Sequence, residues 1–415
     1  MSASFGNRGS SNMDERPVST EEKRSPGRLV LPSLVISRFA TQPPGLLVGL
    51  LLVDIGLTFG TSVGVTGQIR SVSYFVSVIF ALFMGVLSVR FRHRSLLMMG
   101  LLFLSLSALG SGFAPNFDTI LVTYALSGLG MAMVAPMCLT LVGEQFPREK
   151  RPGAIGWVVA GMSIAYVVGS PAVGFIAVLG GWRLAFLGFV LPVSVLSLLL
   201  AGKGISAASR GHRPEMSSRS YFEGFKGILS NRSADACLAG TALSMAAWMA
   251  ILTYSMSFFR QRFLVPTASA SILMLVAALC FTSGSVISAR FVKRYGRKPF
   301  TVLAALFAGM FTLSYASLPN LWMSLTACFL GSFFAGMRVT ASNSLTLEQV
   351  PTFRGTMMSI STAADNAGSS LGTAIGGLAL ILYNYEGMAI SLGAMGVAAA
   401  IVFQLLAKDP TKAEM

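Results

Sequence analysis

The segment EQFPREKR, residues 144–151, has a counterpart in EQVPTFR, residues 348–354. Each copy begins with a Glu-Gln pair, continues with one apolar residue and a proline, and contains an arginine a few positions later. Each copy also separates two long apolar stretches of the chain. A polar phrase that recurs at the same kind of junction predicts an internal repeat, in which two halves of the chain share one design.

Composition predicts that the apolar stretches cross a membrane. Of the 415 residues, 53% are hydrophobic and 11% are charged, whereas a soluble domain carries roughly 25% charged residues. The mean hydropathy is +0.69, and a helix needs about 20 apolar residues to span a bilayer. We therefore expect an all-α integral membrane protein. The predicted helices are 33–55, 67–89, 95–115, 118–143, 153–178, 183–202, 235–259, 267–290, 299–317, 320–346, 355–382 and 385–406.

A polar segment in the middle of the chain divides these twelve predicted helices into six and six. It contains the amphipathic stretch YFEGFKGIL, residues 221–229, which predicts a short helix on the membrane surface. The first residues are polar and rich in Ser, Glu and Arg, which is typical of a disordered tail. The expected parts are a tail (1–32), an N-terminal bundle (33–202), a linker (203–232), a C-terminal bundle (233–406) and a second tail (407–415).

The positions of Lys and Arg predict the orientation. If the N-terminus is cytoplasmic, most of the 31 Lys and Arg residues lie on the cytoplasmic side, and the other side holds only Arg70, Arg183, Arg260 and Arg262. Cytoplasmic loops carry such an excess of positive charge. We therefore expect a multi-pass protein of the cytoplasmic membrane with both termini inside. The net charge of +15 then reflects topology and contact with anionic lipids, not nucleic-acid binding.

The polar junctions carry a resemblance to a known family. The segment ARFVKRYGRKP, residues 289–299, resembles the Gly-x-x-x-Asp-Arg-x-Gly-Arg-Lys loop of the major facilitator superfamily. The segment VRFRHRS, residues 89–95, is a degraded copy, in which Val89 stands at the aspartate position. GWRLAF, residues 181–186, resembles the Gly-Trp-Arg-x-x-Phe motif of the family. The resemblance implies two pseudo-symmetric six-helix bundles that rock against each other around one substrate site.

Within that family, the chain resembles prokaryotic proton-linked efflux permeases. Gly161, Gly169, Pro171 and Gly174 are similar to the antiporter motif on the fifth helix, but Tyr124 replaces the motif's arginine on the fourth. We expect a secondary active transporter of a small organic solute, with proton-coupled export as the first expectation. One alternative is uptake or facilitated exchange of an anionic organic metabolite. A second is a non-transporting sensor or a lipid scramblase on the same fold.

Two charged residues inside predicted helices are the sharpest candidates for a site. Arg338 and Asp365 lie on consecutive antiparallel helices, each about three turns from the junction at 348–354, so we expect them at similar depth. A charge at such a depth usually faces a partner or a wet cavity. The two residues could form a fixed structural ion pair. Alternatively, Arg338 binds an anion or serves coupling, and Asp365 carries a proton.

Other substrate or coupling candidates follow from their position. Arg38 and Gln42 lie near the cytoplasmic start of the first helix, where the arginine either snorkels to the headgroups or faces the cavity. In the resembled family, helices 1, 4, 7 and 10 line that cavity. Aromatic and amide side chains in the predicted helices add weaker candidates, which more commonly serve packing: Tyr124, Trp248, Tyr254 and Asn366.

The basic junctions and their glutamates predict an inner gate. Glu144 and Glu348 each stand opposite a basic loop of their own half, and such pairs can close the cytoplasmic side. Surface pairs contribute only about 0–1 kcal/mol each, so a gate needs several. The alternative is solvated charge that only sets topology. The gate candidates are Arg90, Arg94, Glu144, Arg151, Arg294, Arg297, Lys298, Glu348 and Arg354.

Glycines at every fourth position predict close helix packing, because residues i and i+4 share one face. The packing candidates are Gly161, Gly169, Pro171 and Gly174 on the fifth helix, and Gly368, Gly372 and Gly376 on the eleventh. The sequence has no phosphate-binding G-x-x-x-x-G-K-[ST] loop, metal-ligand cluster or nucleophile triad, so we expect no enzyme activity, cofactor or metal. We expect His93 and His212 to be solvated. The expected partners are a small solute, protons and membrane lipids, for a monomer.

Overall fold

The computed structural model describes residues 27–205, 225–350 and 354–409, and these residues form helices and connecting turns without any strand. Most of the predicted first tail, His212 and residues 221–224 of the amphipathic stretch lie outside the described residues. Residues 225–229 of that stretch are helical. The first half contains α1 (Val30–Ala40), α2 (Pro43–Phe59), α3 (Val63–Arg90), α4 (His93–Gly112), α5 (Phe117–Gln145), η1 (Arg148–Lys150), α6 (Arg151–Ala185), η2 (Phe186–Val190) and α7 (Leu191–Gly204).

The second half follows the same plan. It contains α9 (Arg232–Met249), η3 (Ala250–Tyr254), α10 (Ser255–Arg262), α11 (Thr267–Tyr295), α12 (Arg297–Ser314), α13 (Leu321–Leu347), α14 (Arg354–Leu382) and α15 (Tyr385–Leu405). Each half begins with an interrupted pass: α1 and α2 are separated at Thr41, and α9 and α10 are joined through the π turn η3. The break before α2 is explained by Pro43 and Pro44, which cannot donate backbone hydrogen bonds.

One long helix accounts for two of the predicted passes. α6, η2 and α7 form an apolar helical stretch, Arg151–Gly204, which is 54 residues long. The chain reverses inside α6 at Gly180 and Gly181, where Gly181 has a φ of +74° that favours glycine. The described residues contain nine stretches long and apolar enough to cross a membrane. With this reversal, and with α12 and α14, they give the twelve passes, so the predicted fold class is confirmed.

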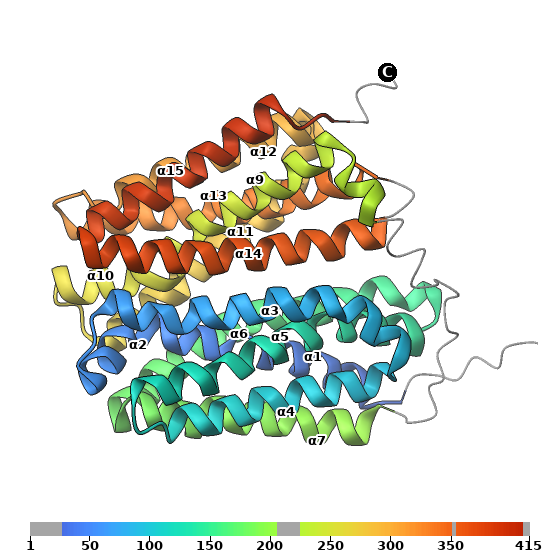
Figure 1. The fold of residues 1–415 in the computed structure, drawn as a ribbon, viewed down its shortest axis with the longest axis horizontal. Coiled ribbons are helices and arrows are strands. Elements are labelled where there is room, and N and C mark those ends of the chain that lie inside the picture. The colour runs from blue at the N-terminus through green and yellow to red at the C-terminus, as the bar shows by residue number, and fades with distance from the viewer. Residues whose placement is uncertain (1–26, 206–224, 351–353, 410–415) are drawn as a thin grey trace, which may run out of the picture.

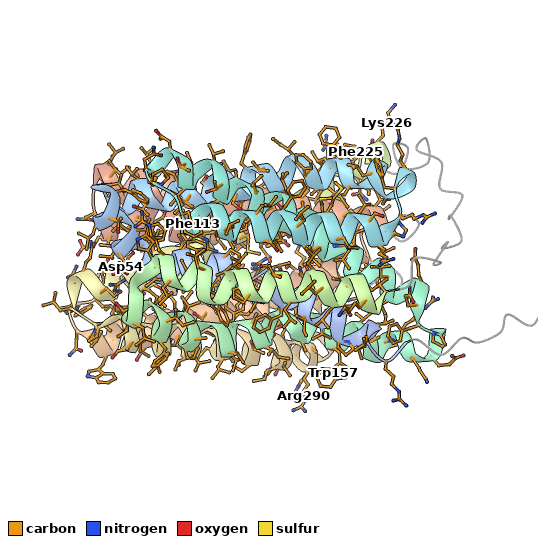
Figure 2. The ribbon with its side chains drawn as sticks, turned by 90° about the horizontal axis from the view of Figure 1, so that it is seen from below. Asp54, Phe113, Trp157, Phe225, Lys226 and Arg290 are labelled. Atoms are coloured by element: carbon orange, nitrogen blue, oxygen red, sulfur yellow. The ribbon has the colours of Figure 1, made fainter. Side chains whose placement is uncertain are left out.

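The two halves form separate groups of helices (Figure 1). α3 packs beside α14, and α6 packs against α11, so these four helices make most of the contact between halves. α4 and α7 lie on the outer side of one half, and α12 and α15 on the outer side of the other. Large apolar side chains such as Trp157 and Phe113 point outward (Figure 2). An apolar outer surface is what contact with lipid requires.

The polar residues define two ends, named here by their charge. The basic end is the one where α3 ends and α4 begins, near Arg90 and Arg94, and where α13 ends at Leu347. The opposite end holds Asp54 and Arg260. In Figure 2, Lys226 lies at the basic end and Asp54 at the opposite end.

The glycines of α6 and α14 lie where helices approach most closely. A Cβ atom at Gly161 would be 2.7 Å from the carbonyl oxygen of Val35 in α1, and one at Gly372 would be 2.5 Å from the backbone of Ala246 in α9. Gly368 lies still more tightly against Ala242 of α9, where a Cβ atom would collide with the carbonyl oxygen. The fifth pass therefore packs on the first, and the eleventh on the seventh, in matching ways.

The remaining packing candidates have different neighbours. Gly169 lies near Leu46, and Gly376 near Tyr254 and Leu392. Gly174 lies against Ser271 of α11, so it belongs to the contact between halves. Pro171 lies within α6, whose non-helical residues are Gly180 and Gly181.

Candidate functional site

An ion pair joins the two halves at the opposite end. Both guanidinium nitrogens of Arg260 on α10 donate to the carboxylate of Asp54 on α2, at 2.5 and 2.9 Å. The same guanidinium also donates to the backbone oxygen of Leu50, at 3.2 Å. Such a two-point contact fixes the angle as well as the distance between the partners. The sequence interpretation had placed Arg260 in an outer loop and had given Asp54 no role.

A second arginine joins the halves deeper inside. Arg70 of α3 is 2% exposed, whereas the sequence analysis counted it among the charges at the non-cytoplasmic surface. It donates to the backbone oxygen of Leu252 in η3 at 3.2 Å and to the hydroxyl of Tyr74 at 3.0 Å. In a π turn the backbone hydrogen bonds shift by one residue, which leaves a carbonyl free for such a contact. Tyr124 and Tyr166 complete the surroundings of this guanidinium.

The hydrogen bonds between α3 and α14 lie at a definite depth. Ser71 and Ser370 each donate a side-chain hydrogen bond to the other's backbone oxygen at 3.0 Å. Closer to the basic end, Asn366 donates to the hydroxyl of Ser77 at 3.2 Å. Between described residues, no hydrogen bond joins the halves nearer to the basic end than this one. Asp365, the predicted proton carrier, directly precedes the last contact.

At the basic end, the polar contacts of the described residues lie within each half. His93 and Glu144 form an ion pair between α4 and α5, and Arg297 lies 3.7 Å from Glu348. The partner of Glu144 is thus a histidine that sequence reasoning had assigned to solvent. Two other gate candidates donate to backbone oxygens of their own half: Arg94 to Gly202 at 2.6 Å and Arg151 to Phe146 at 2.9 Å. Arg294 lies over the ring of Tyr295, Arg90 is exposed and Lys298 is half-buried. The side chain of Arg354 is outside the described set.

The pKa of His93 is raised by this arrangement. His93 is the first residue of α4 and belongs to the basic junction that precedes the predicted helix 95–115. Its Nδ1 bonds the carboxylate of Glu144, which is the main reason that the pKa of His93 is raised above 6.5. The backbone oxygen of Ser88, 3.1 Å from Nε2, acts in the same direction. The protonated ring donates to both oxygens, so the pair is strongest when His93 is charged.

Arg338 and Asp365 do not form an ion pair. Each lies about three turns from the basic end, in agreement with the predicted depth. They interact electrostatically, yet among the described residues Arg338 makes no hydrogen bond and no ion pair. Its Nη2 is buried without a partner, and the whole side chain is 2% exposed. Asp365 is half-buried. A buried guanidinium without an ion pair is costly, which makes Arg338 a candidate for binding an anion.

Arg38 is a partly exposed cation inside the first half. It lies in the last turn of α1, is half-buried, and makes no side-chain hydrogen bond to a described residue. Its nearest ionisable neighbours are Cys138 and Tyr166. The Gln42 amide that we had grouped with it donates instead to the hydroxyl of Thr41, at 2.7 Å.

The aromatic candidates serve packing in this conformation. Tyr254 is fully buried, and its hydroxyl donates to the backbone of Thr373 at 2.6 Å. Tyr124 is buried edge-on to Phe186. Trp248 is stacked on Phe281, with 4.9 Å between ring centres. No group of three or more His, Cys, Asp or Glu residues suited to a metal occurs in the part of the chain that the structure describes.

Two six-helix bundles of common design, joined by contacts between their helices, are the arrangement of transporters built from internal repeats. The family model described as Major Facilitator Superfamily matches residues 34–320 and 265–414. The chain belongs to this superfamily, and it is a transporter, not an enzyme.

Two relatives and one solved structure show what the chain is similar to. A protein of Cupriavidus pinatubonensis, named "Probable 4-methylmuconolactone transporter", is 26% identical over 355 residues, which are 83% of this chain and 81% of the relative. The "Purine ribonucleoside efflux pump NepI" of Shigella sonnei is 30% identical over 136 residues, 33% of this chain and 34% of the pump. The crystal structure of a D-xylose-proton symporter superposes with a TM-score of 0.74 at 17% identity, covering 92% and 97% of the two chains.

Proposed function

We propose that the protein couples the movement of a proton to that of a small organic anion across the cytoplasmic membrane. In this proposal the basic end and both termini are cytoplasmic, as the excess of Lys and Arg there indicates. The structure is then an inward-facing state, since the halves are held together at the opposite end. One chain contains both halves and acts as the transport unit.

The observation that carries the proposal is the uncompensated positive charge of the interior. Among the described residues, Arg38, Arg70 and Arg338 lie inside the helices with Asp365 as the carboxylate at similar depth, and the other acids lie near helix ends. A low-dielectric wall around charges of one sign concentrates counter-ions of the other sign. A solute that carries a carboxylate or a similar group supplies the missing charge. Arg38 is the guanidinium best placed to meet it, because it is accessible and has no described partner.

The position of Asp365 supplies the coupling. When Asp365 is ionised, its negative charge repels an anionic solute and partly offsets the positive charge of Arg338. When Asp365 binds a proton, the repulsion disappears and the positive charge of the interior attracts the anion to Arg38. Proton and anion therefore favour each other's binding, and this reciprocity is required by thermodynamic linkage. The expected mode is symport, which favours uptake down the proton gradient.

Asp365 also lies beside the last hydrogen bond between the halves, where a conformational change would alter its surroundings. The adjacent Asn366 makes the last hydrogen bond between the halves, to Ser77. A change in charge at Asp365 therefore acts next to the border between the joined and the separate parts of the two halves. This position supports the role of proton carrier and not that of a remote structural charge.

Export coupled to proton entry remains the second candidate. It is favoured by the relative named as a purine ribonucleoside efflux pump and by the glycines of α6 that resemble the antiporter motif. In an exporter, proton and solute would compete for the site, so each would weaken the binding of the other. The sign of the coupling thus separates the two candidates. Family membership favours both over a non-transporting sensor.

The test is transport by purified protein in lipid vesicles, with imposed pH gradients of either sign. A panel of labelled aromatic and aliphatic carboxylates would be compared with neutral analogues of the same size. Symport predicts accumulation of a carboxylate in vesicles that are more alkaline inside, and no accumulation of its neutral analogue. Accumulation only in vesicles that are more acidic inside would support the exporter. Equal movement of charged and neutral analogues would refute anion selectivity.

A further inference from the structure

A small cavity lies inside the second half, away from the contact between halves. Its wall is formed by α9, α12, α13 and α15, and it has room for about one water-sized molecule. Most of the wall consists of alanine and glycine, with Ser244, Trp248, Thr312 and Arg338 as the side chains that carry hydrogen-bonding groups. The cavity is thus too small for an organic solute and belongs to no transport path described above.

The cavity is bordered by the buried charge that lacks a partner. Arg338 lines it, is 2% exposed, and has its Nη2 buried without any hydrogen bond. A water molecule could satisfy a hydrogen bond of this group but would leave its charge uncompensated. The field of Asp365 reaches Arg338, but the two do not form an ion pair. A buried charge in a membrane protein normally has a counter-ion.

The polar groups of the wall are suited to an anion. The guanidinium of Arg338 and the indole N–H of Trp248 can only donate hydrogen bonds. The Thr312 hydroxyl makes no hydrogen bond to a described residue and can also donate, whereas Ser244 already donates to the backbone of Gly240. No carboxylate lines the cavity. A set of donors around one positive charge binds a negative ion and repels a cation.

We propose that this cavity binds one monovalent halide ion, chloride under ordinary conditions, as the counter-ion of Arg338. The size of the cavity restricts the ligand to a small spherical anion, since a carboxylate needs more room. The nearby backbone of Gly309 and Gly396 approaches so closely, with a Cβ of one placed 2.7 Å from the other, that the wall cannot expand much. The order of affinity is therefore chloride, then bromide, then iodide.

The first test measures the thermal stability of the full-length purified protein in detergent. Chloride replaces gluconate at constant ionic strength, and no organic solute is present. A ligand that binds only the folded protein stabilises it, and the stabilisation grows with the logarithm of the ratio of ligand concentration to Kd. At a chloride concentration about 100 times Kd, the melting temperature should therefore rise by a few degrees. The assay involves no transport, so its result does not depend on whether the proposed function is correct. An identical melting temperature in chloride and gluconate would overturn the proposal.

Two variants locate the effect. Arg338→Gln removes the charge and should abolish the dependence on chloride, while Arg290→Gln removes an arginine that is exposed on the surface (Figure 2) and should leave the dependence unchanged. Thr312→Val keeps the shape of the wall but removes one donor, and it should raise the half-maximal chloride concentration several-fold. Retention of the full chloride effect in Arg338→Gln would place the ion elsewhere and refute the proposal.

A direct test remains available if Arg338→Gln does not fold. Crystals of the wild-type protein grown in bromide should show an anomalous scattering peak between Arg338 and Thr312. Diffraction that resolves both side chains but gives no peak there would contradict the proposal.

Discussion

The two ends of the molecule use charge in opposite ways. At the end opposite the basic end, Arg260 of the second half binds Asp54 of the first at 2.5 and 2.9 Å. At the basic end, His93 binds Glu144 and Arg297 lies near Glu348, each pair within its own half. The same kinds of side chain therefore tie the halves together at one end and stabilise each half separately at the other.

This difference indicates which contacts a conformational change must break. Opening the opposite end requires the loss of the Arg260–Asp54 pair and of the hydrogen bonds between α3 and α14. At the basic end, no hydrogen bond or ion pair between described residues joins the halves. Asp365 lies at the border of the two regions, beside the Asn366–Ser77 hydrogen bond. The proposed proton carrier Asp365 thus directly adjoins the last hydrogen bond between the halves.

The largest effect is expected from removing the charge at that border. Asp365→Asn keeps the shape of the side chain but cannot release a proton. At a pH gradient equivalent to about 100 mV, the coupled transporter can sustain roughly a 50-fold solute gradient, and the variant should lose it. Solute exchange at equilibrium should persist. Asp118→Asn changes an exposed carboxylate in the first turn of α5 and is the matched control. Gradient-driven accumulation that survives in Asp365→Asn would remove this residue from the mechanism.

A methyl group between the halves should push them apart at the opposite end. A Cβ at Gly64 of α3 would collide with the backbone oxygen of Gly377 in α14, whereas one at Gly156 of α6 would meet nothing within 4 Å. Overpacking costs about 1–3 kcal/mol, which is enough to shift the populations at least about fivefold. In Gly64→Ala, spin labels at the exposed positions Leu57 and Tyr383 should show a longer distance. Gly156→Ala should show the wild-type distance, and an unchanged distance in both would mean that α3 and α14 adapt without opening.

Loss of the ion pair between halves should have a smaller effect in the same direction. Asp54→Asn removes one charge of a partly exposed pair, and such pairs contribute about 1 kcal/mol or less, which is at most about a fivefold change in population. The control is Glu386→Gln, because Glu386 binds Arg262 at 3.0 Å within one half at the same end. The charge reversal Asp54→Arg with Arg260→Asp should restore the wild-type distance distribution. If Glu386→Gln shifts the distance as much as Asp54→Asn, the contact between halves has no special role.

The smallest effect is expected at the basic end. Glu144→Gln removes the partner of His93 and should lower stability by about 1 kcal/mol or less, without changing the distance between halves. Because the pKa of His93 is raised in the folded state, its contribution is fully present below about pH 6.5 and is lost as the pH rises through the folded-state pKa. The melting temperatures of wild type and variant should therefore converge above that pKa. A constant difference from pH 5 to pH 9 would show that His93 is not protonated in the pair.

The sequence predicted the architecture well because apolar length and positive charge are local signals. The twelve passes, the junctions and the similar depth of Arg338 and Asp365 all follow from spacing along single helices. The contacts between halves were missed. Asp54 and Arg260 are 206 positions apart, and each lies near a helix end where charge is ordinary. Arg70 was counted among the charges of the non-cytoplasmic side because it lies near the start of the predicted helix 67–89, whereas α3 begins at Val63 and the arginine side chain is buried.

The choice of partners could not be predicted for a related reason. His93, which the sequence analysis assigned to solvent, pairs with Glu144, because α4 begins with the ring facing α5. Likewise, similar depth did not bring Arg338 and Asp365 together, since the rotation of each helix about its axis decides where a side chain points. Spacing along a helix gives depth, but the packing of neighbouring helices gives direction.

The central claim is that a proton and an anion bind together at the site that includes Asp365. It is tested most directly by adding a transported carboxylate to purified protein in weakly buffered solution and following the pH with a dye. The account predicts proton uptake, close to one proton per bound anion at a pH where Asp365 is ionised without solute, and none in Asp365→Asn. Proton release on binding would contradict the account and identify the protein as an exchanger of protons for solute.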